Sequence, residues 1–332
     1  MYESIDTITL KSGERVEAGV VKGPDPDWAE GIEALLEHKA EIWRWGNTMV
    51  LRGHPDVEAY FYILHRGGIP FANMSTVETR GVGIFGHVYT RPEDRRKRAA
   101  MELMRVMMDH FRRRGGQALY LGTGYDSHPY HIYRAHGFEG LEPHSGYMDY
   151  YSTSRDAFET GYFASGPTEV AALDWRDWPA STALFAGGFP GVTRCAGMRI
   201  FGRQSTEGPL LPFIRDASTR RTDGKSARVM VLRQRETTAV AGLTMWSFDS
   251  LWPRSCVVDV YCHPHYWDRA GELLDELELP GADRYLAYCD AGFKPKAAAL
   301  SQAGFRASAT YGQRVARDKA RTGYVDVTVW EK

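Results

Sequence analysis

Apolar residues recur along the first third of the chain at spacings that predict a hairpin, helices and then three strands. Residues 6–21 alternate apolar and polar positions around a polar turn, which predicts a hairpin. Residues 28–45 carry apolar side chains at helical spacing and predict one or two helices. Three apolar runs then predict strands at 59–64, 70–78 and 82–90.

The clearest amphipathic pattern covers residues 95–113 and predicts a helix. One stripe is apolar and the opposite stripe is charged, with Gly115 and Gly116 at the end. A strand at 117–121 and a short helix at 129–136 follow. Residues 82–121 therefore read strand, helix, strand, a unit whose two strands should be parallel.

The second half repeats this order of elements. Strands are predicted at 169–173, 227–232, 238–246, 256–262 and 284–289, with helices from Trp175 and at 266–277 and 295–303. Pro92 and Gly137 in the first half correspond to Pro264 and Gly304 in the second. We expect an internal duplication in an α/β fold: a first domain at 1–152, a linker at 153–167 and a second domain at 168–332, each a mixed sheet flanked by helices.

Composition adds limits on partners and compartment. The chain has 332 residues, a net charge of −1, 43% hydrophobic and 25% charged residues, as in ordinary soluble proteins. No apolar run is long enough for a membrane span, and the polar first ten residues lack a signal peptide, so we expect a cytoplasmic protein with no membrane partner. The charge balance argues against a nucleic-acid partner, and monomer and homodimer both remain open. The four cysteines, all in the second half, are expected to be reduced and buried.

Four consecutive cations follow the strand at 82–90, namely Arg95, Arg96, Lys97 and Arg98. Cations are unfavourable at a helix N-terminus, which carries the positive end of the helix dipole, so four of them there suggest a function. Unpaired N–H groups and the positive end of the helix dipole attract phosphates, which the cations would also bind. The sequence thus predicts a phosphate site, and a solvated basic surface turn is the alternative.

Residues 95–100 and 130–138 together resemble motifs A and B of the GNAT superfamily of N-acyltransferases. In that family a loop of the pattern Gln/Arg-x-x-Gly-x-Gly/Ala binds the pyrophosphate of coenzyme A. Arg95 matches its first position and Ala100 its last, while Arg98 stands where the family usually has glycine. The resemblance implies acetyl-CoA as the cofactor, bound by Arg95, Arg96, Lys97, Arg98, Ala99 and Ala100.

The same resemblance implies further cofactor contacts. The family's strand before the loop splays from the next parallel strand and pantetheine lies in the gap, which here implies His87, Val88 and Tyr89. The family's Tyr-x-x-x-Gly-Phe ending matches Tyr133, Gly137 and Phe138, and implies that Tyr133 protonates the departing thiolate. Ser127 and Tyr130 complete the expected contacts.

The general base and a metal site must be sought among less specific candidates. Glu78, at the end of the neighbouring strand, is the first choice for the base and His87 is the second. Asp126 and His128 also follow the second strand, and for each residue a cap or loop role is an alternative. Asp259, Cys262, His263 and His265 cluster, but no second ligand pair with regular spacing accompanies them, so we expect no metal site.

The second copy lacks the cation run, since residues 267–272 read Trp-Asp-Arg-Ala-Gly-Glu, and Leu300 stands at the position of Tyr133. We therefore expect a degenerate second domain and an N-acetyltransferase that acts on a small-molecule amine by direct attack. The absence of cysteine from the first half excludes a cysteine-bound acyl intermediate there. O-acyl transfer, acyl-CoA decarboxylation and a non-catalytic coenzyme A sensor remain alternatives.

Overall fold

The computed structural model describes residues 1–53 and 55–332. Internal contacts divide the chain into two compact units: Met1–Glu139 with Met148–Thr153, and Gly140–Tyr147 with Ser154–Lys332. Each unit contains a mixed sheet flanked by helices, so the predicted α/β fold class is confirmed.

The segment 153–167, predicted as the linker, contains helix α5 (Arg155–Tyr162) of the second unit. Its Ser, Thr and Gly content suits a loop, but the Ser154 side chain accepts a hydrogen bond from the Ala157 amide and caps the helix start. Phe158 and Tyr162 are buried along it. Residues Gly140–Tyr147 also group with the second unit, although the predicted first domain includes them.

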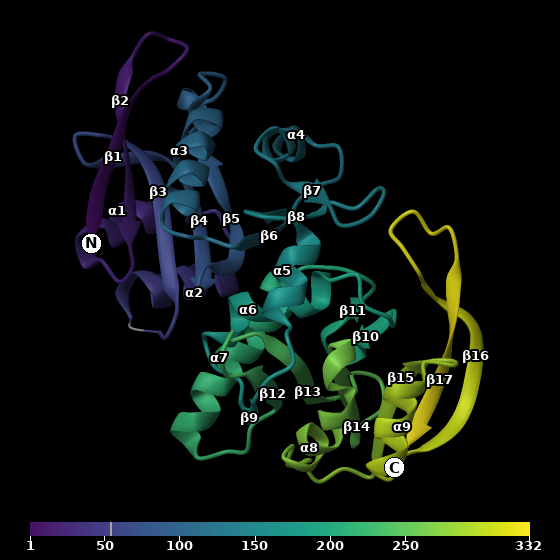
Figure 1. Cartoon of the computed structure of the whole chain (residues 1–332). Helices are drawn as coiled ribbons and strands as arrows, with labels where there is room; N and C mark the ends of the chain where they lie inside the picture. Colours follow the sequence, from purple (N-terminus) through teal and green to yellow (C-terminus); the bar gives the residue numbers. More distant parts are fainter. Residues whose placement is uncertain (54) are drawn as a thin grey trace. The chain divides into compact units, whose positions relative to one another are not determined.

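The first unit is built on an eight-stranded sheet in the order β1-β2-β3-β4-β5-β6-β8-β7 (Figure 1). Neighbours from β1 to β5 pair antiparallel, and β5 pairs parallel with β6, as the strand–helix–strand pattern predicts. The strands are β1 (Tyr2–Thr9), β2 (Arg15–Lys22), β3 (Glu58–Arg66), β4 (Ile69–Thr79), β5 (Val82–Thr90), β6 (Ala118–Gly122), β7 (Glu139–Gly140) and β8 (Tyr147–Tyr151).

Helices cover this sheet. The apolar stripe of α3 (Ala99–Arg113), including Leu103 and Met107, joins one buried cluster with strand residues such as Tyr62 and Phe85. Phe61 and Ile63 alternate with Tyr62 and are also fully buried, so the other face of the sheet is covered as well. Helices α1 (Pro26–Leu35), α2 (Glu41–Arg52) and the short α4 (His128–Ala135) complete the unit.

Two irregularities of β5 prepare the site. β5 pairs with β6 only from Val82 to Ile84, and beyond that point the two parallel strands separate. On its other side, the register with β4 shifts, so that His87 and Val88 together stand opposite Met74. His87 has a φ of 53°, the left-handed conformation that a bulge often requires.

The second unit is a seven-stranded sheet in the order β16-β17-β15-β14-β13-β12-β9, again with one parallel pair, β14 and β15. Its strands are β9 (Thr168–Ala172), β12 (Val229–Gln234), β13 (Val240–Phe248), β14 (Ser255–Cys262), β15 (Arg284–Asp290), β16 (Arg306–Ala316) and β17 (Tyr324–Glu331). The unit also contains a two-stranded sheet of β10 (Thr193–Cys195) and β11 (Ile200–Phe201). Its further helices are α6 (Asp177–Ala186), α7 (Glu207–Asp223), α8 (Ala270–Asp275) and α9 (Lys294–Gln302).

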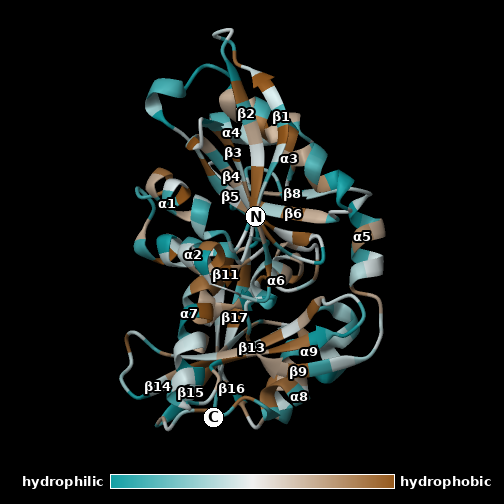
Figure 2. Cartoon of the chain, turned by 90° about the vertical axis from the view of Figure 1, so that its left-hand side faces the viewer, coloured by the Kyte–Doolittle hydropathy of each residue, from teal (hydrophilic) through white to brown (hydrophobic). Residues whose placement is uncertain are grey.

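Burial follows the hydrophobic pattern in both units. Figure 2 shows hydrophobic residues recurring along the strands, while loops carry much of the hydrophilic sequence. All four cysteines are free and buried in the second unit, as expected. No helix in the described part of the chain is long and apolar enough to cross a membrane.

Candidate active site

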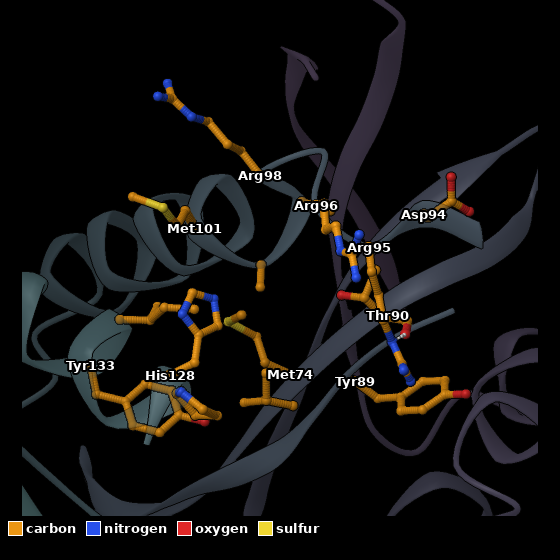
Figure 3. Close-up of a pocket in the computed structure, with 15 residues that line it drawn as sticks. Met74, Tyr89, Thr90, Asp94, Arg95, Arg96, Arg98, Met101, His128 and Tyr133 are labelled. Carbon is orange, nitrogen blue, oxygen red and sulfur yellow. Dashed lines mark hydrogen bonds between the residues drawn. The ribbon is translucent and has the colours of Figure 1, made fainter. Parts of the chain in front are cut away.

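A cavity of about 600 Å³ opens in the first unit where β5 ends and α3 begins. It lies on the side where β5 and β6 have separated, and α4 supplies a further wall. Eight of the residues that the sequence predicted to contact the cofactor line it: Val88, Tyr89, Arg95, Arg96, Arg98, Ala99, Ala100 and Tyr133. Figure 3 shows Arg95 and Arg96 on one side, His128 and Tyr133 on the other, and Met74 between them.

The four cations form a turn before the helix, whereas the sequence predicted that the helix begins at residue 95. A short 3₁₀ turn, Pro92–Asp94, precedes them, and α3 begins at Ala99. Arg96 and Arg98 have φ values of 64° and 65°, in the left-handed region that favours glycine. Arg98 therefore adopts the backbone conformation of glycine where the resembling family usually has glycine. Holding a residue with a side chain in that conformation costs about 1–2 kcal/mol.

The cationic side chains point in different directions. The Arg95 Nε donates a hydrogen bond to the Thr90 carbonyl oxygen at 3.1 Å, and its guanidinium lies 5.6 Å from the centre of the Tyr89 ring. Arg98 extends away from Arg95 and Arg96 (Figure 3). Lys97 does not line the cavity, and its ammonium pairs with Asp94 at 2.8 Å.

The second wall of the cavity comes from α4. Ser127 caps this helix by accepting a hydrogen bond from the Tyr130 amide at 3.4 Å, which fixes where the helix starts. Tyr133 is buried, lines the cavity and meets the Phe85 ring edge to face at 5.4 Å. Ser127 and Tyr130, both expected to contact the cofactor, lie outside the lining, and the Tyr130 ring packs against Tyr125.

The structure does not bring Glu78, the first candidate for the general base, to the cavity. Glu78 pairs with Gly83 at the start of β5, whereas the cavity lies at the other end of that strand. Its carboxylate is fully buried and bound to Arg114, with an Nη1–Oε2 distance of 2.7 Å, and the Thr76 hydroxyl donates to it at 2.5 Å. Burial raises the pKa of Glu78 despite the lowering by Arg114. These contacts indicate a structural ion pair.

His87, the second candidate, lies on the bulge but not in the lining. Its ring meets the Trp43 ring edge to face at 5.6 Å, and its Nδ1 has no hydrogen-bond partner among the described residues. Burial, followed by the nearby Lys39 and His38, lowers the pKa of His87 to about 3. The imidazole is thus a weak base near neutral pH. Asn73, which the sequence did not single out, donates from Nδ2 to the His87 carbonyl oxygen at 3.0 Å and braces the bulge.

Several lining residues were missed or only weakly indicated by the sequence. His128 was one of the lesser base candidates, and the structure places it in the cavity at the start of α4, whereas Asp126 pairs with His131 at 3.1 Å. The periodicity of the strand and helices could have indicated which apolar side chains share the face of Tyr133 and Val88. The missed residues are Met74, Thr90, Asp94, Met101, Pro129 and Ile132.

In the second unit a buried ion pair joins helix α9 to strand β14. β14 and β15 pair only from Ser255 to Val257, after which they separate as β5 and β6 do. Lys296 of α9 places its ammonium 2.5 Å from Asp259 of β14 and 2.9 Å from the Thr193 carbonyl oxygen, and the lysine and aspartate are completely buried.

The turn after β14 is packed against the same unit's own chain. The Phe163 ring stacks on His263 with a centroid distance of 4.4 Å, and the Tyr266 hydroxyl donates to the Ala164 carbonyl oxygen at 2.6 Å. Within the cluster weighed as a metal site, His263 takes part in this ring stack and Asp259 pairs with Lys296. The described residues contain no group of three or more His, Cys, Asp or Glu side chains placed to hold a metal ion.

Comparison with known proteins finds no matching family model and no matching curated protein. Among solved structures, a GNAT-family acetyltransferase from Bacillus anthracis is similar at 11% identity and a TM-score of 0.32, over 50% of this chain and 93% of that one. A putative acetyltransferase from Salmonella typhimurium, solved with its cofactor acetyl-CoA, is similar at 17% identity and a TM-score of 0.35, over 50% of this chain and 92% of that one. A ribosomal-protein-alanine N-acetyltransferase from Brucella melitensis is similar at 18% identity and a TM-score of 0.36, over 49% of this chain and 98% of that one. The likeness is distant, so the cavity itself carries the functional conclusion.

Proposed function

We propose that the first unit binds acetyl-CoA in this cavity and transfers its acetyl group to the amine of a small molecule by direct attack. The observation that carries the proposal is the cavity, which joins a turn of three arginines to an apolar wall that contains Tyr133, beside two parallel strands that separate.

The lining residues fit coenzyme A by their chemistry. Arg95, Arg96 and Arg98, together with the free N–H groups at the start of α3, suit a pyrophosphate. The left-handed backbone at Arg98 supplies the conformation for which the resembling family uses glycine. Met74, Val88 and Ile132 offer an apolar wall for the pantetheine arm.

Acetyl-CoA supplies an activated thioester, and the protein residues position it and manage protons. Tyr133 holds on its phenolic oxygen the proton that the leaving thiolate takes up. A backbone N–H of β5 near the bulge stabilises the negative charge that develops on the thioester oxygen. The attacking amine loses its proton to water or to His128, since His87 is too weak a base at neutral pH.

The test is acetyl-CoA-dependent release of a free thiol, measured with the full chain and a panel of small amines and chemically matched alcohols. We expect at least one amine to accelerate thiol release and to appear as its acetamide by mass spectrometry. Arg96→Glu should raise the KM for acetyl-CoA, because it reverses one charge of the phosphate site. Acceleration by alcohols alone would favour O-acyl transfer, and loss of carbon dioxide from malonyl-CoA would favour decarboxylation.

A non-catalytic coenzyme A sensor is the second candidate, and one observation favours it. Among the described residues that line the cavity, His128 is the single histidine, and it is exposed, so the lining offers no buried general base of that type. Tight acetyl-CoA binding without thiol release for any amine, alcohol or malonyl-CoA would support the sensor.

A further inference from the structure

Asp94 is a carboxylate in a cavity that otherwise suits an anion. It lines the cavity beside Arg95 and Arg96, yet its side chain is only 3% exposed. In Figure 3 its carboxylate points away from the side on which Tyr133, His128 and Met74 lie. A negative charge this close to a phosphate site opposes anion binding unless it has another purpose.

The Asp94 carboxylate is neutralised by two cations. The Arg66 guanidinium binds it through two hydrogen bonds, Nη1–Oδ2 at 3.0 Å and Nη2–Oδ1 at 2.7 Å, and Lys97 adds a third at 2.8 Å. These bonds, first those from Arg66, lower the pKa of Asp94 to about 2, so the group stays ionised at neutral pH. Asp94 thus pairs with two cations that are not themselves part of the cavity lining.

The same guanidinium reaches a third segment of the chain. Arg66, at the end of β3, also binds Glu14 of the β1–β2 hairpin, with Nε–Oε1 at 2.6 Å and Nη2–Oε2 at 2.9 Å. Its guanidinium lies 4.0 Å from the centre of the buried Phe71 ring, which limits its movement. The hairpin and the cation turn are joined a second time by the Lys11 amide, which donates to the Lys97 carbonyl oxygen at 3.0 Å.

We propose that Asp94, held by Arg66 and Glu14, is a positioning residue that fixes the turn Arg95–Arg98 in its phosphate-binding conformation. The turn contains two arginines in the left-handed region, a conformation that persists only where surrounding contacts enforce it. Lys97 pairs with Asp94 and so helps to hold the turn, instead of contacting phosphate. The inference rests on the proposed function, because it assigns a role within the coenzyme A site.

The direction in which Asp94→Asn changes the affinity for an anion distinguishes a positioning role from simple electrostatic repulsion. Asp94→Asn keeps the shape of the side chain, removes a negative charge and weakens the bonds to Arg66 and Lys97, so Coulomb attraction alone predicts tighter binding of an anion. Positioning predicts weaker binding, by about five- to tenfold, because the turn loses charge-assisted hydrogen bonds that hold it. Glu14→Gln also removes a negative charge and should weaken binding in the same direction, although it lies outside the cavity lining.

The experiment is calorimetric titration of the full chain with coenzyme A, for wild type, Asp94→Asn, Glu14→Gln and the control Glu93→Gln. Glu93 is the exposed neighbour of Asp94 and forms no ion pair within the described ranges, so its variant reports charge alone and should bind as tightly as wild type or slightly tighter. If Asp94→Asn does not fold, Glu14→Gln still decides. Binding by both variants at or above wild-type affinity would overturn the positioning role. A wild-type chain that does not bind coenzyme A would instead contradict the proposed function.

Discussion

At the scale of single residues, the cation turn holds two arginines, Arg96 and Arg98, in the left-handed backbone conformation that favours glycine. Arg98 is the residue before α3 and has a φ of 65°. Arg98→Gly and Arg98→Ala both remove the guanidinium, but only glycine relieves the left-handed strain. We expect the glycine variant to exceed the alanine variant in free energy of unfolding by about 1 kcal/mol, measured in urea.

The two Arg98 variants also separate backbone from charge in cofactor binding. Both lose one cation, so both should bind coenzyme A more weakly than wild type. The glycine variant keeps the turn at lower cost and should bind at least as well as the alanine variant. Equal stability of the two would mean that the left-handed conformation at Arg98 carries no strain.

Tyr133 is the residue on which the proposed chemistry depends most. Tyr133→Phe removes the hydroxyl and leaves the ring, which packs edge to face on Phe85. A positioned acid contributes about 10²–10⁴ to the rate, and the lower end is expected because a thiolate leaves fairly well unprotonated. We predict a kcat lower by about a hundredfold and little change in acetyl-CoA affinity, measured by steady-state kinetics and titration. Unchanged kcat with weakened affinity would make Tyr133 a binding residue.

At the scale of elements, hydrophobic periodicity predicts most of this fold, because strands and helices must each bury one face. The strands β3, β4 and β5 and helix α3 appear close to their predicted ranges. Helix α7 was missed because it contains Pro212 and its buried residues lie only in its first half. Strand β16 is largely exposed and polar, so it has no clear alternation, whereas Val325, Val327 and Val329 of β17 do alternate and could have been used.

Side-chain placement within those elements is less accessible from sequence. The strand pattern places Glu78 at the end of β4 and His87 on β5. It does not show that Arg114, at the C-terminal end of α3, binds Glu78. Nor does the run of cations show which of them turns back to Asp94, since that depends on the left-handed angles at Arg96 and Arg98. The resemblance therefore predicts which residues surround the site, while their contacts with Arg66, Asp94 and Arg114 come from the structure.

A buried ion pair, Lys296–Asp259, joins α9 to β14. Lys296→Met leaves the Asp259 carboxylate buried without its cation, which typically costs about 3–5 kcal/mol. We expect the second unit to unfold at lower urea concentration. Because all four cysteines are buried in that unit, the rate of thiol labelling measures its opening specifically.

The control for this variant lies two residues away on the same helix. Lys294 is exposed, and Lys294→Met should change stability by less than about 0.5 kcal/mol. Lys296→Met combined with Asp259→Asn should recover part of the lost stability. In the wild type the backbone N–H of Ala196 donates to the Asp259 carboxylate at 2.5 Å, and the side-chain oxygen of asparagine can accept the same hydrogen bond. Labelling of Lys296→Met at the wild-type rate would show that the ion pair does not stabilise the unit.

At the scale of the whole molecule, the two units share a succession of elements and differ in what lies between their parallel strands. In the first unit the separated strands border an open cavity with three arginines. In the second, Lys296 of α9 and Asp259 of β14 form a buried ion pair, and the Phe163 ring stacks on His263 in the turn that follows β14. The second unit thus keeps the succession of elements, but its turn after β14 lacks the run of four cations found in the first unit.

This difference predicts that one acetyl-CoA binds per chain. Calorimetric titration of the full chain should give a stoichiometry near one. Reversing the charge of Arg95 and Arg98 should weaken that binding by roughly 1–3 kcal/mol, the range for charge-assisted hydrogen bonds, and should leave no second binding phase. The matched control is Arg269→Glu in the corresponding turn of the second unit, where Arg269 pairs with Glu272 at 2.6 Å. It should leave cofactor affinity unchanged. A stoichiometry near two, or weaker binding by Arg269→Glu, would show that the second unit binds the cofactor as well.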